Sequence, residues 1–273
     1  MVFVLVLVLV LEIVGKTDER TNLMRAYWTL TRRELGGYFL SLTGYIILAA
    51  TLFLTGLSFV DLLVKLRGEA LTMPLTEVFF ETWWFPIILV LTTPVITMRL
   101  FALEKFSGTF ETLLTTPVSD LQVVLAKFTA ALTFYTVLWL PLMGCVLLIK
   151  HYTNDRTPLD AGLMGSTFLG IFLVGGLLVA LGGCASALTR SQVAAAIMGL
   201  ALGFSLLLLA FLADKFPEPA SWQAQVLACL ALFDHLRNFA RGVVDTRPVV
   251  LWVSLTLFLL FLNLRIVESR RWK

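Results

Sequence analysis

The residue types that most often do chemistry in proteins are few in this chain and widely spaced. The two histidines, His151 and His235, have no cysteine or carboxylate cluster at metal-ligand spacing around them. The three cysteines, Cys145, Cys184 and Cys229, are too scattered to define a disulfide framework. Neither HExxH nor GxSxG occurs. We therefore expect no metal site and no catalytic residue, and an enzymatic function is the least supported class.

Two further absences concern the energy source. The chain contains no GxxxxGK[ST] loop, whose glycines and lysine would bind the phosphates of ATP. The interiors of its long apolar runs also lack ionisable residues, which normally mark proton relays or ion pathways in membranes. A proton- or sodium-coupled carrier is therefore disfavoured. If ATP supplies the energy, another polypeptide must bind it.

One polar stretch, residues 99–127, does carry closely spaced signals, and it lies between two uncharged apolar runs. Gly108 can end the preceding helix and cap a following one, because Glu111 stands three residues further on. The spacing predicts a short helix with one apolar side. That side would consist of Phe110, Leu113 and Leu114.

A second helix start follows directly. Pro117 ends the short helix, and Ser119 with Gln122 three residues later forms a capping box. A plain connection between two apolar runs does not need two sets of caps. From spacing alone, the short helix is equally well explained as an interfacial helix resting on lipid or as a docking helix for a partner.

The composition requires a membrane protein. Of 273 residues, 59% are hydrophobic and only 14% are charged, which is far outside the usual composition of a soluble domain. Each bilayer crossing needs roughly 20 residues and tolerates about 17. We expect an all-α fold with six transmembrane helices in one domain, residues 24–273. The six runs are 35–60, 82–98, 128–149, 161–189, 191–213 and 246–264.

The placement of Lys and Arg predicts the orientation. With the N-terminus inside, the cytoplasmic segments from residue 24 onward hold eleven Lys and Arg, whereas the external segments hold eight. The positive-inside rule then places both termini and residues 99–127 in the cytoplasm. We expect a multi-pass protein of the inner (plasma) membrane.

The N-terminal region divides in two. Residues 1–11 are apolar but too short to span a bilayer, and no positive region precedes them, so neither a transmembrane helix nor a signal peptide fits. We expect residues 1–23 to be a dispensable extension. The chain then continues as an amphipathic helix on the cytoplasmic leaflet. Its apolar face would consist of Met24, Trp28, Thr31, Leu35, Tyr38 and Phe39.

The second run contains Pro86 and Pro94, each of which removes an intrahelical donor and tends to kink a helix. We expect a helix that can hinge and that leads directly into residues 99–127. In the fourth and fifth runs small residues recur about every fourth position, which lets helices approach closely in lipid. Packing within one subunit is favoured over contact between subunits. The small residues are Gly176, Ala180, Gly183 and Ala187, and Ser191, Ala195, Gly199 and Gly203.

Two external segments are expected. The segment that holds Glu77 is predicted to be a solvated loop. In residues 214–247, Ser221 and Asp234 are N-caps and Gly242 is a stop, which predicts two short helices in a re-entrant or interfacial hairpin. We expect this hairpin to act as an external gate. The gate residues would be Trp222, Phe233, His235 and Phe239.

Several of these motifs together resemble ABC-2 type transporter permeases. The resemblance rests on the ordered residues Arg99, Ala102, Glu104, Lys105, Gly108, Thr109, Glu111, Leu113, Leu114, Pro117, Val118 and Ser119. Leu103 stands where many members have a second acid. The opening MRAYWTLTRRELGGYF is similar to that of the permease family. The string FDHLRNFARGVVDTR and the closing ESRRW resemble the branch that includes gliding-motility and nitrous-oxide-reductase-maturation permeases.

The resemblance implies the permease subunit of an ABC transporter, usually an exporter, in which residues 99–127 form a cytoplasmic coupling helix. A separate ATPase subunit would hold ATP and Mg²⁺. A second copy or a paralogous permease and membrane lipid would be the other partners, without nucleic acid. The alternative is a membrane anchor for ATPase-driven mechanical or assembly work without cargo flux. The ATPase contacts would be Glu104, Lys105, Gly108, Thr109, Phe110, Glu111, Leu113, Leu114 and Pro117.

Overall fold

The computed structural model describes residues 17–65, 74–80, 82–109, 118–152, 161–213 and 232–269. In these ranges all regular structure is helical. The helices are α2 Thr17–Phe39, α3 Leu42–Lys65, α4 Leu75–Phe80, α5 Trp84–Thr97, α6 Ala102–Ser107, α8 Asp120–Tyr152, α9 Ala161–Leu188, α10 Gln192–Ala213, α12 Leu232–Ala240 and α13 Thr246–Ser269.

Six helical stretches of the described residues are long and apolar enough to cross a membrane. Each overlaps one of the six predicted runs, so the number and order of the spans are confirmed. The stretches are Leu42–Lys65, Trp84–Ser107, Asp120–Ile149, Ala161–Leu188, Gln192–Leu209 and Thr246–Ser269.

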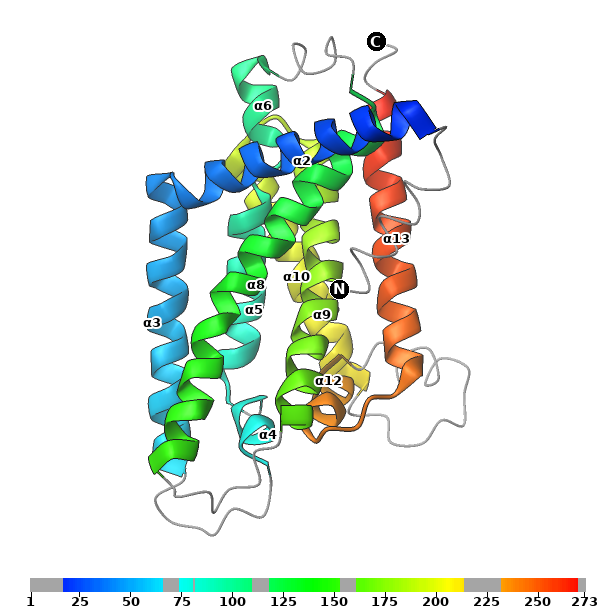
Figure 1. The fold of residues 1–273 in the computed structure, drawn as a ribbon. Coiled ribbons are helices and arrows are strands. Elements are labelled where there is room, and N and C mark those ends of the chain that lie inside the picture. Colours follow the sequence, from blue (N-terminus) through cyan, green and yellow to red (C-terminus); the bar gives the residue numbers. More distant parts are fainter. Residues whose placement is uncertain are drawn as a thin grey trace.

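The spans form one bundle around α9, which packs against α5, α8, α10, α12 and α13. Helix α2 crosses one end of the bundle, and α6 and the end of α13 lie at that same end (Figure 1). Helices α4 and α12 lie at the opposite end. Helices α9 and α10 are joined by only three residues and pack together, as antiparallel neighbours were predicted to do.

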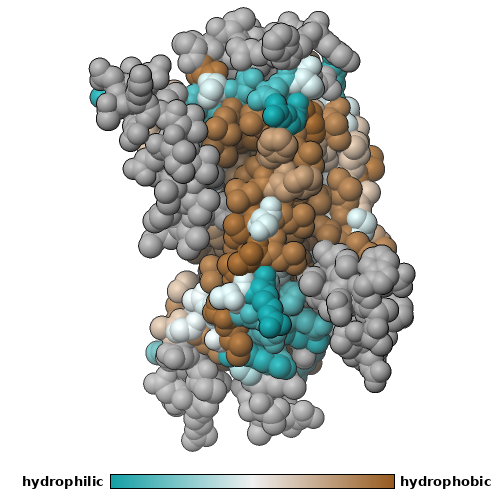
Figure 2. Space-filling view, turned by 90° about the vertical axis from the view of Figure 1, so that its right-hand side faces the viewer, coloured by the Kyte–Doolittle hydropathy of each residue, from teal (hydrophilic) through white to brown (hydrophobic). Residues whose placement is uncertain are grey.

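The outer surface of the bundle is apolar over its middle. Figure 2 shows a hydrophobic band between two more polar ends. Large side chains are highly exposed on three spans, including Phe53 of α3 at 66%, Ile197 of α10 at 63% and Phe258 of α13 at 55%. Monomers in water rarely expose so extended an apolar surface, whereas contact with lipid tails carries no such cost. The band is therefore the membrane-facing surface.

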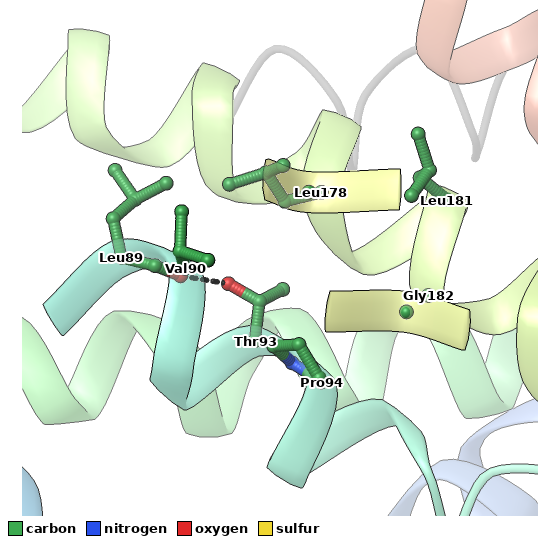
Figure 3. Close-up of a pocket in the computed structure, with 9 residues that line it drawn as sticks. Leu89, Val90, Thr93, Pro94, Leu178, Leu181 and Gly182 are labelled. Carbon is green, nitrogen blue, oxygen red and sulfur yellow. Dashed lines mark hydrogen bonds between the residues drawn. The ribbon is translucent and has the colours of Figure 1, made fainter. Parts of the chain in front are cut away.

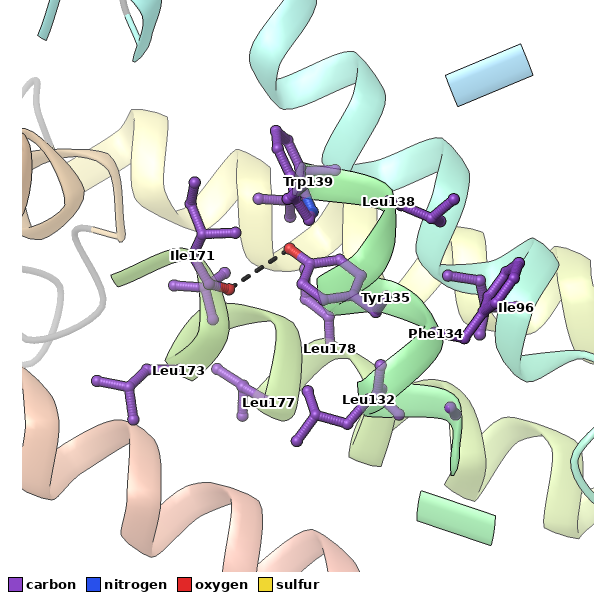
Figure 4. Close-up of a cluster of buried hydrophobic side chains, with 14 of the residues drawn as sticks. Ile96, Leu132, Phe134, Tyr135, Leu138, Trp139, Ile171, Leu173, Leu177 and Leu178 are labelled. Carbon is purple, nitrogen blue, oxygen red and sulfur yellow. Dashed lines mark hydrogen bonds between the residues drawn. The ribbon is translucent and has the colours of Figure 1, made fainter. Parts of the chain in front are cut away.

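Glycines of α9 receive large side chains from neighbouring helices. The ring of Tyr135 on α8 lies against Gly175 so closely that a Cβ there would be 2.0 Å from Cε1 of Tyr135. The Tyr135 hydroxyl points to the carbonyl of Ile171 at 3.5 Å, and Trp139 packs beside it in the buried cluster (Figure 4). The absence of a side chain at Gly175 thus fixes how deeply α8 packs into α9.

The small residues of the predicted stripes differ in what they contact. Gly183 faces the side chain of Asn263 on α13, whose amide donates to the carbonyl of Ala180 at 3.0 Å. The nearest atom to a Cβ at Gly176 would be 4.0 Å away, and at Gly203 nothing lies within 4 Å. Neighbouring helices therefore approach α9 and α10 closely at only some of these small residues.

The two prolines of the second span also differ. Pro86 lies in the first turn of α5, where an amide would have no intrahelical acceptor in any case, so the kink predicted there is not required. Only Pro94 is interior. It packs against Gly199 and borders a small apolar cavity of about 10 Å³ beside Gly182, where Thr93 donates to the Leu89 carbonyl at 2.5 Å (Figure 3).

Two helix boundaries differ from the predictions. Helix α2 begins at Thr17, so it includes residues ahead of Met24. Helix α12 begins at Leu232, which places Asp234 inside the first turn rather than at the cap. Its predicted stop is confirmed, because Gly242 has a left-handed φ of 83° two residues after the helix ends. The other predicted hairpin helix, near Ser221, lies outside the described residues.

We predict that Gly175→Ala lowers the free energy of unfolding by about 1–3 kcal/mol, because the new methyl group overlaps the Tyr135 ring. The adjacent Gly176→Ala is the matched control and should be neutral or slightly stabilising, since its methyl group has room. Denaturation of the purified chain in detergent measures both. Equal effects of the two substitutions would contradict this account of the α8–α9 contact.

Candidate functional site

The polar end of the bundle is built around α6, which follows α5 after a short turn. The backbone amides of Phe101 and Ala102 at its start both bond the hydroxyl of Ser186 on α9, at 3.0 and 3.1 Å. A side chain from another span thus satisfies helix-terminal donors that would otherwise lack acceptors. Lys105 of α6 donates to the carbonyl of Ala187, which also lies on α9. Helix α6 is therefore fastened to the end of α9.

Gly108 ends α6 in a left-handed conformation with φ 75°, as a glycine after a helix typically does. Thr109 follows it and is exposed, with its hydroxyl 2.8 Å from that of Ser107. The predicted short helix lies outside the described residues. This applies to the expected contact residues Phe110, Glu111, Leu113, Leu114 and Pro117.

The start of α8 confirms the second capping signal. The amide of Ser119 donates to the side-chain oxygen of Gln122 at 3.0 Å, and the amide of Gln122 donates to the Ser119 hydroxyl at 3.3 Å. This reciprocal pair is the capping box predicted from the sequence. Helix α8 then continues without interruption from Asp120 to Tyr152.

Four charged residues meet where α2, α6 and α8 come together, and we call them the Lys127 cluster: Arg33, Glu34, Glu104 and Lys127. The ammonium of Lys127 lies 3.1 Å from Oε1 of Glu34 and 2.9 Å from Oε1 of Glu104. Arg33 contacts the same two oxygens at 2.8 and 3.2 Å. Two cations and two carboxylates thus balance one another.

Lys127 is the buried centre of this cluster. Its side chain is only 3% exposed, against 54% for Arg33, and its ammonium also lies 5.7 Å from the centre of the Phe101 ring. One oxygen of Glu104, Oε2, is buried without a hydrogen bond. Removing one partner from such a buried group leaves the others uncompensated, at a cost of about 3–5 kcal/mol. The cluster should therefore be sensitive to single substitutions.

The cluster also perturbs Glu34. Burial alone would raise the pKa of this carboxyl, but the charge of Lys127 and hydrogen bonds from Arg33 and Lys127 outweigh burial and hold the pKa below its ordinary value of 4.5. Glu34 therefore remains ionised at neutral pH and can act as a permanent partner of Lys127.

Helix α2 packs on α8 through one face. The Tyr27 hydroxyl lies 3.0 Å from that of Thr129, and the Tyr38 ring stacks on Phe134 with centroids 4.9 Å apart. Trp28, which was predicted to share the apolar face, is instead 60% exposed, because Tyr27 takes the position toward the bundle. The exposed Trp28 lies at the level of the polar end, where an interfacial helix would meet lipid.

Arg99 joins the turn before α6 to the corner between α2 and α3. Its guanidinium donates to the hydroxyl of Ser41 at 3.3 Å and to that of Thr43. Polar side chains thus connect α2, α3, α6, α8 and α9 with one another at the polar end of the bundle.

The opposite end has a charged contact that the sequence analysis missed. Glu77 was expected in a solvated loop, but it is 1% exposed and accepts from Nε of Arg241 at 2.8 Å. Thr76 donates to the carbonyl of Ala240 at 2.7 Å. Helix α4 is therefore bound to the end of α12, and only a long-range contact could have revealed this pairing.

The expected gate residues lie on α12 or outside the described part of the chain. Phe239 is 1% exposed and stacks on Trp252 of α13 at 5.7 Å, while His235 meets the same indole edge-on at 6.0 Å. Phe233 is partly buried against the core, and Trp222 is among the residues that are not described. The aromatic residues of α12 thus face their own subunit, and a gating role stays a prediction.

The comparison with protein families agrees with this architecture. Residues 76–264, more than half of the chain, match the family described as ABC-2 family transporter protein. The chain belongs to the ABC-2 family of transporter proteins. No curated protein matches it. The matched region includes Glu104 and Lys127, whereas Arg33 and Glu34 precede it.

Membership of the ABC-2 family makes the chain a membrane permease component of an ABC transporter, a non-catalytic part that in this family generally works with an ABC ATPase subunit. No group of three or more His, Cys, Asp or Glu residues within the described ranges is arranged to hold a metal ion.

The ABC-2 permease also has an apolar groove of about 400 Å³ on the membrane-facing side of α5 and α10. Side chains between Trp83 and Leu91 form one wall, and side chains between Leu200 and Leu208 form the other. All of the lining residues are apolar, so the groove offers a surface for lipid or protein but no polar recognition.

We predict that Glu34→Gln lowers the free energy of unfolding by about 1.5–3 kcal/mol near neutral pH, because Lys127 loses a charged partner. A carboxyl with a lowered pKa contributes stability above its unfolded value, and this contribution disappears as the pH falls through the lower folded value. The difference between variant and parent should therefore shrink below pH 4.5. Thermal unfolding across this pH range measures it, with Glu268→Gln, which breaks the exposed pair with Arg265, as control. A difference that is independent of pH would contradict the assignment.

Proposed function

We propose that this chain is the permease subunit of an ABC exporter and that residues 99–127 receive mechanical input from a separate cytoplasmic ATPase subunit. That subunit would hold ATP and Mg²⁺, and two permease chains, identical or paralogous, would pair in the inner membrane. The observation that carries the proposal is the ion pair between Glu104 and Lys127, which lie on either side of residues 105–126. This ion pair links α6 directly to α8, so that a force on the residues between them is passed to the membrane spans.

The surroundings of α6 support this role. The helix is joined to α5 by the chain, to α9 through Ser186 and Lys105, and to α2 and α8 through the Lys127 cluster. Phe106 on the same helix is 77% exposed. A segment with firm internal attachments and an exposed outer side suits docking to a partner better than a connection that only rests on lipid.

The individual docking roles follow from the sequence. Phe110, Leu113 and Leu114 would enter an apolar groove of the ATPase, and Glu111 would make polar contacts at its edge. Glu104 is used differently, because one of its oxygens is bound within the subunit by Lys127 and Arg33. We therefore assign Glu104 to the base of the segment and leave the outer contacts to the residues beyond Gly108.

Three further assignments complete the proposal. The interfacial placement of α2 is supported by the exposed Trp28 and by its position across the polar end. The external hairpin would act as an outer gate. Affiliation with the gliding-motility and nitrous-oxide-reductase-maturation branch is proposed from FDHLRNFARGVVDTR and the closing ESRRW.

The docking role predicts that the double substitution Phe110→Asp and Leu114→Asp releases the ATPase subunit. Burial of these two side chains contributes about 3–6 kcal/mol together, so affinity should fall at least about a hundredfold. Co-purification of the ATPase with the permease from detergent extracts measures this. Arg190→Asp, in the turn between α9 and α10, is the control and should retain the ATPase. Co-purification and transport that survive the double substitution would refute the docking role.

The orientation predicts which surface an impermeant thiol reagent reaches. In a chain whose Cys145, Cys184 and Cys229 have been replaced, Thr109→Cys should react only after permeabilisation of intact cells. Val244→Cys, exposed at the opposite end, should react from outside without permeabilisation. Labelling of Thr109→Cys from the outer surface would overturn both the orientation and the proposed function.

A further inference from the structure

We propose that the Lys127 cluster is a mechanical joint that makes α2 and α8 move with α6, with Lys127 as its positioning residue. The inference rests on the proposed function, because it concerns where the input from an ATPase goes. Chain continuity would deliver a movement of α6 to α5 before it and to α8 after it. The cluster adds a direct contact with α8 and a route to α2, which is remote in sequence from α6.

The geometry gives the joint one shared atom. A single ammonium, on α8, holds a carboxylate oxygen of α2 at 3.1 Å and one of α6 at 2.9 Å. If α6 moved away alone, Glu104 would lose both Lys127 and Arg33. If α2 moved away, Lys127 would lose one of its two carboxylates in a site that is almost closed to water. The three helices are therefore held in a fixed relation that an apolar contact would not impose, since apolar surfaces can slide.

The other contacts of α2 show what the cluster adds. Tyr27 and Tyr38 attach α2 to α8, and Tyr38 also donates to the carbonyl of Ile96 on α5 at 2.9 Å. Arg33 and Glu104 form a direct polar contact between α2 and α6. Removal of the cluster should therefore free α6 from α2 while α2 stays in place on the bundle.

The cluster could instead serve only to stabilise the fold, and stability measurements alone would not separate the two roles. A distance between α2 and α6 does so, because only a joint keeps that distance constant while α6 moves. Arg25 on α2 and Ser107 on α6 are exposed and suit spin labels. Ser269, at the end of α13, is a third exposed position and outside the cluster.

The experiment uses the full chain with its ATPase subunit in lipid nanodiscs, after replacement of Cys145, Cys184 and Cys229. Distances are measured by pulsed electron paramagnetic resonance in the nucleotide-free and vanadate-trapped states. In the parent, the Ser107→Cys to Ser269→Cys distance should shift between states. The Arg25→Cys to Ser107→Cys distance should remain constant.

In Lys127→Met, the first distance should still shift, whereas the second should now differ between states by more than the width of its distribution. Because this variant leaves Arg33 as the remaining cation for both carboxylates, the triple substitution Glu34→Gln, Glu104→Gln and Lys127→Met also removes these ion pairs and gives the same test. Lys127→Arg keeps the charge and should restore the constant distance. Arg265→Gln breaks an exposed pair and should change neither distance.

Two results would overturn the inference alone. The α2–α6 distance would either stay constant in both the single and the triple variant, or already change in the parent. A parent complex that does not retain the ATPase, or in which Ser107 does not shift relative to Ser269, would instead overturn the proposed function, and this inference with it. The two failures are therefore distinguishable in one set of samples.

Discussion

The positive charge of Lys127 determines how the polar end of this protein is assembled. An ammonium that is nearly closed to water must be matched by carboxylates, because an unpaired charge in such surroundings is too costly to keep. Two carboxylates pair with this ammonium, Glu34 from α2 and Glu104 from α6. Their mutual repulsion is tolerable only with the ammonium between them and with Arg33 at the rim. One cation thus joins α2, α6 and α8 at the place where they meet.

The middle of the bundle is held by different means. Lipid tails are as apolar as the helices, so burial of apolar surface gives little preference for one helix arrangement over another. Close packing between helices has to provide that preference. Gly175 and Gly182 of α9 provide this, because they receive Tyr135 of α8 and Thr97 of α5 at distances that any side chain would prevent. Helix α9 thereby becomes the fixed element to which Ser186 attaches the start of α6.

The parts of this structure that could be predicted are those with a local cause. Hydropathy located all six spans, and spacing located the capping box of Ser119 and Gln122, because each signal is contained within a few consecutive residues. The pairing of Glu77 with Arg241 joins residues 164 positions apart, and no local pattern encodes it. Lys127 does leave a local sign, a lone lysine among apolar residues directly before the predicted span 128–149. The positive-inside rule uses it only as a cytoplasmic charge.

The hinge predicted from Pro86 and Pro94 in the second span is only partly supported, again because its effect depends on more than local sequence. Proline marks a missing donor wherever it occurs, but its effect depends on its position in the helix, and the helix boundary could not be known to within a turn. With α5 starting at Trp84, the bending tendency is confined to Pro94.

The position of Pro94 links the two ends of the molecule. Toward the end that holds α4 and α12, α5 follows Thr82, whose hydroxyl is 3.0 Å from that of Ser58 on α3. Toward the polar end, α6 begins only a few residues after α5 and is fastened by the Lys127 cluster and α9. Both ends are thus attached through polar contacts, whereas Pro94 lies beside Gly182, Gly199 and a small cavity. If the two ends change their relative orientation, the helix can absorb the change at Pro94, where an intrahelical hydrogen bond is already missing.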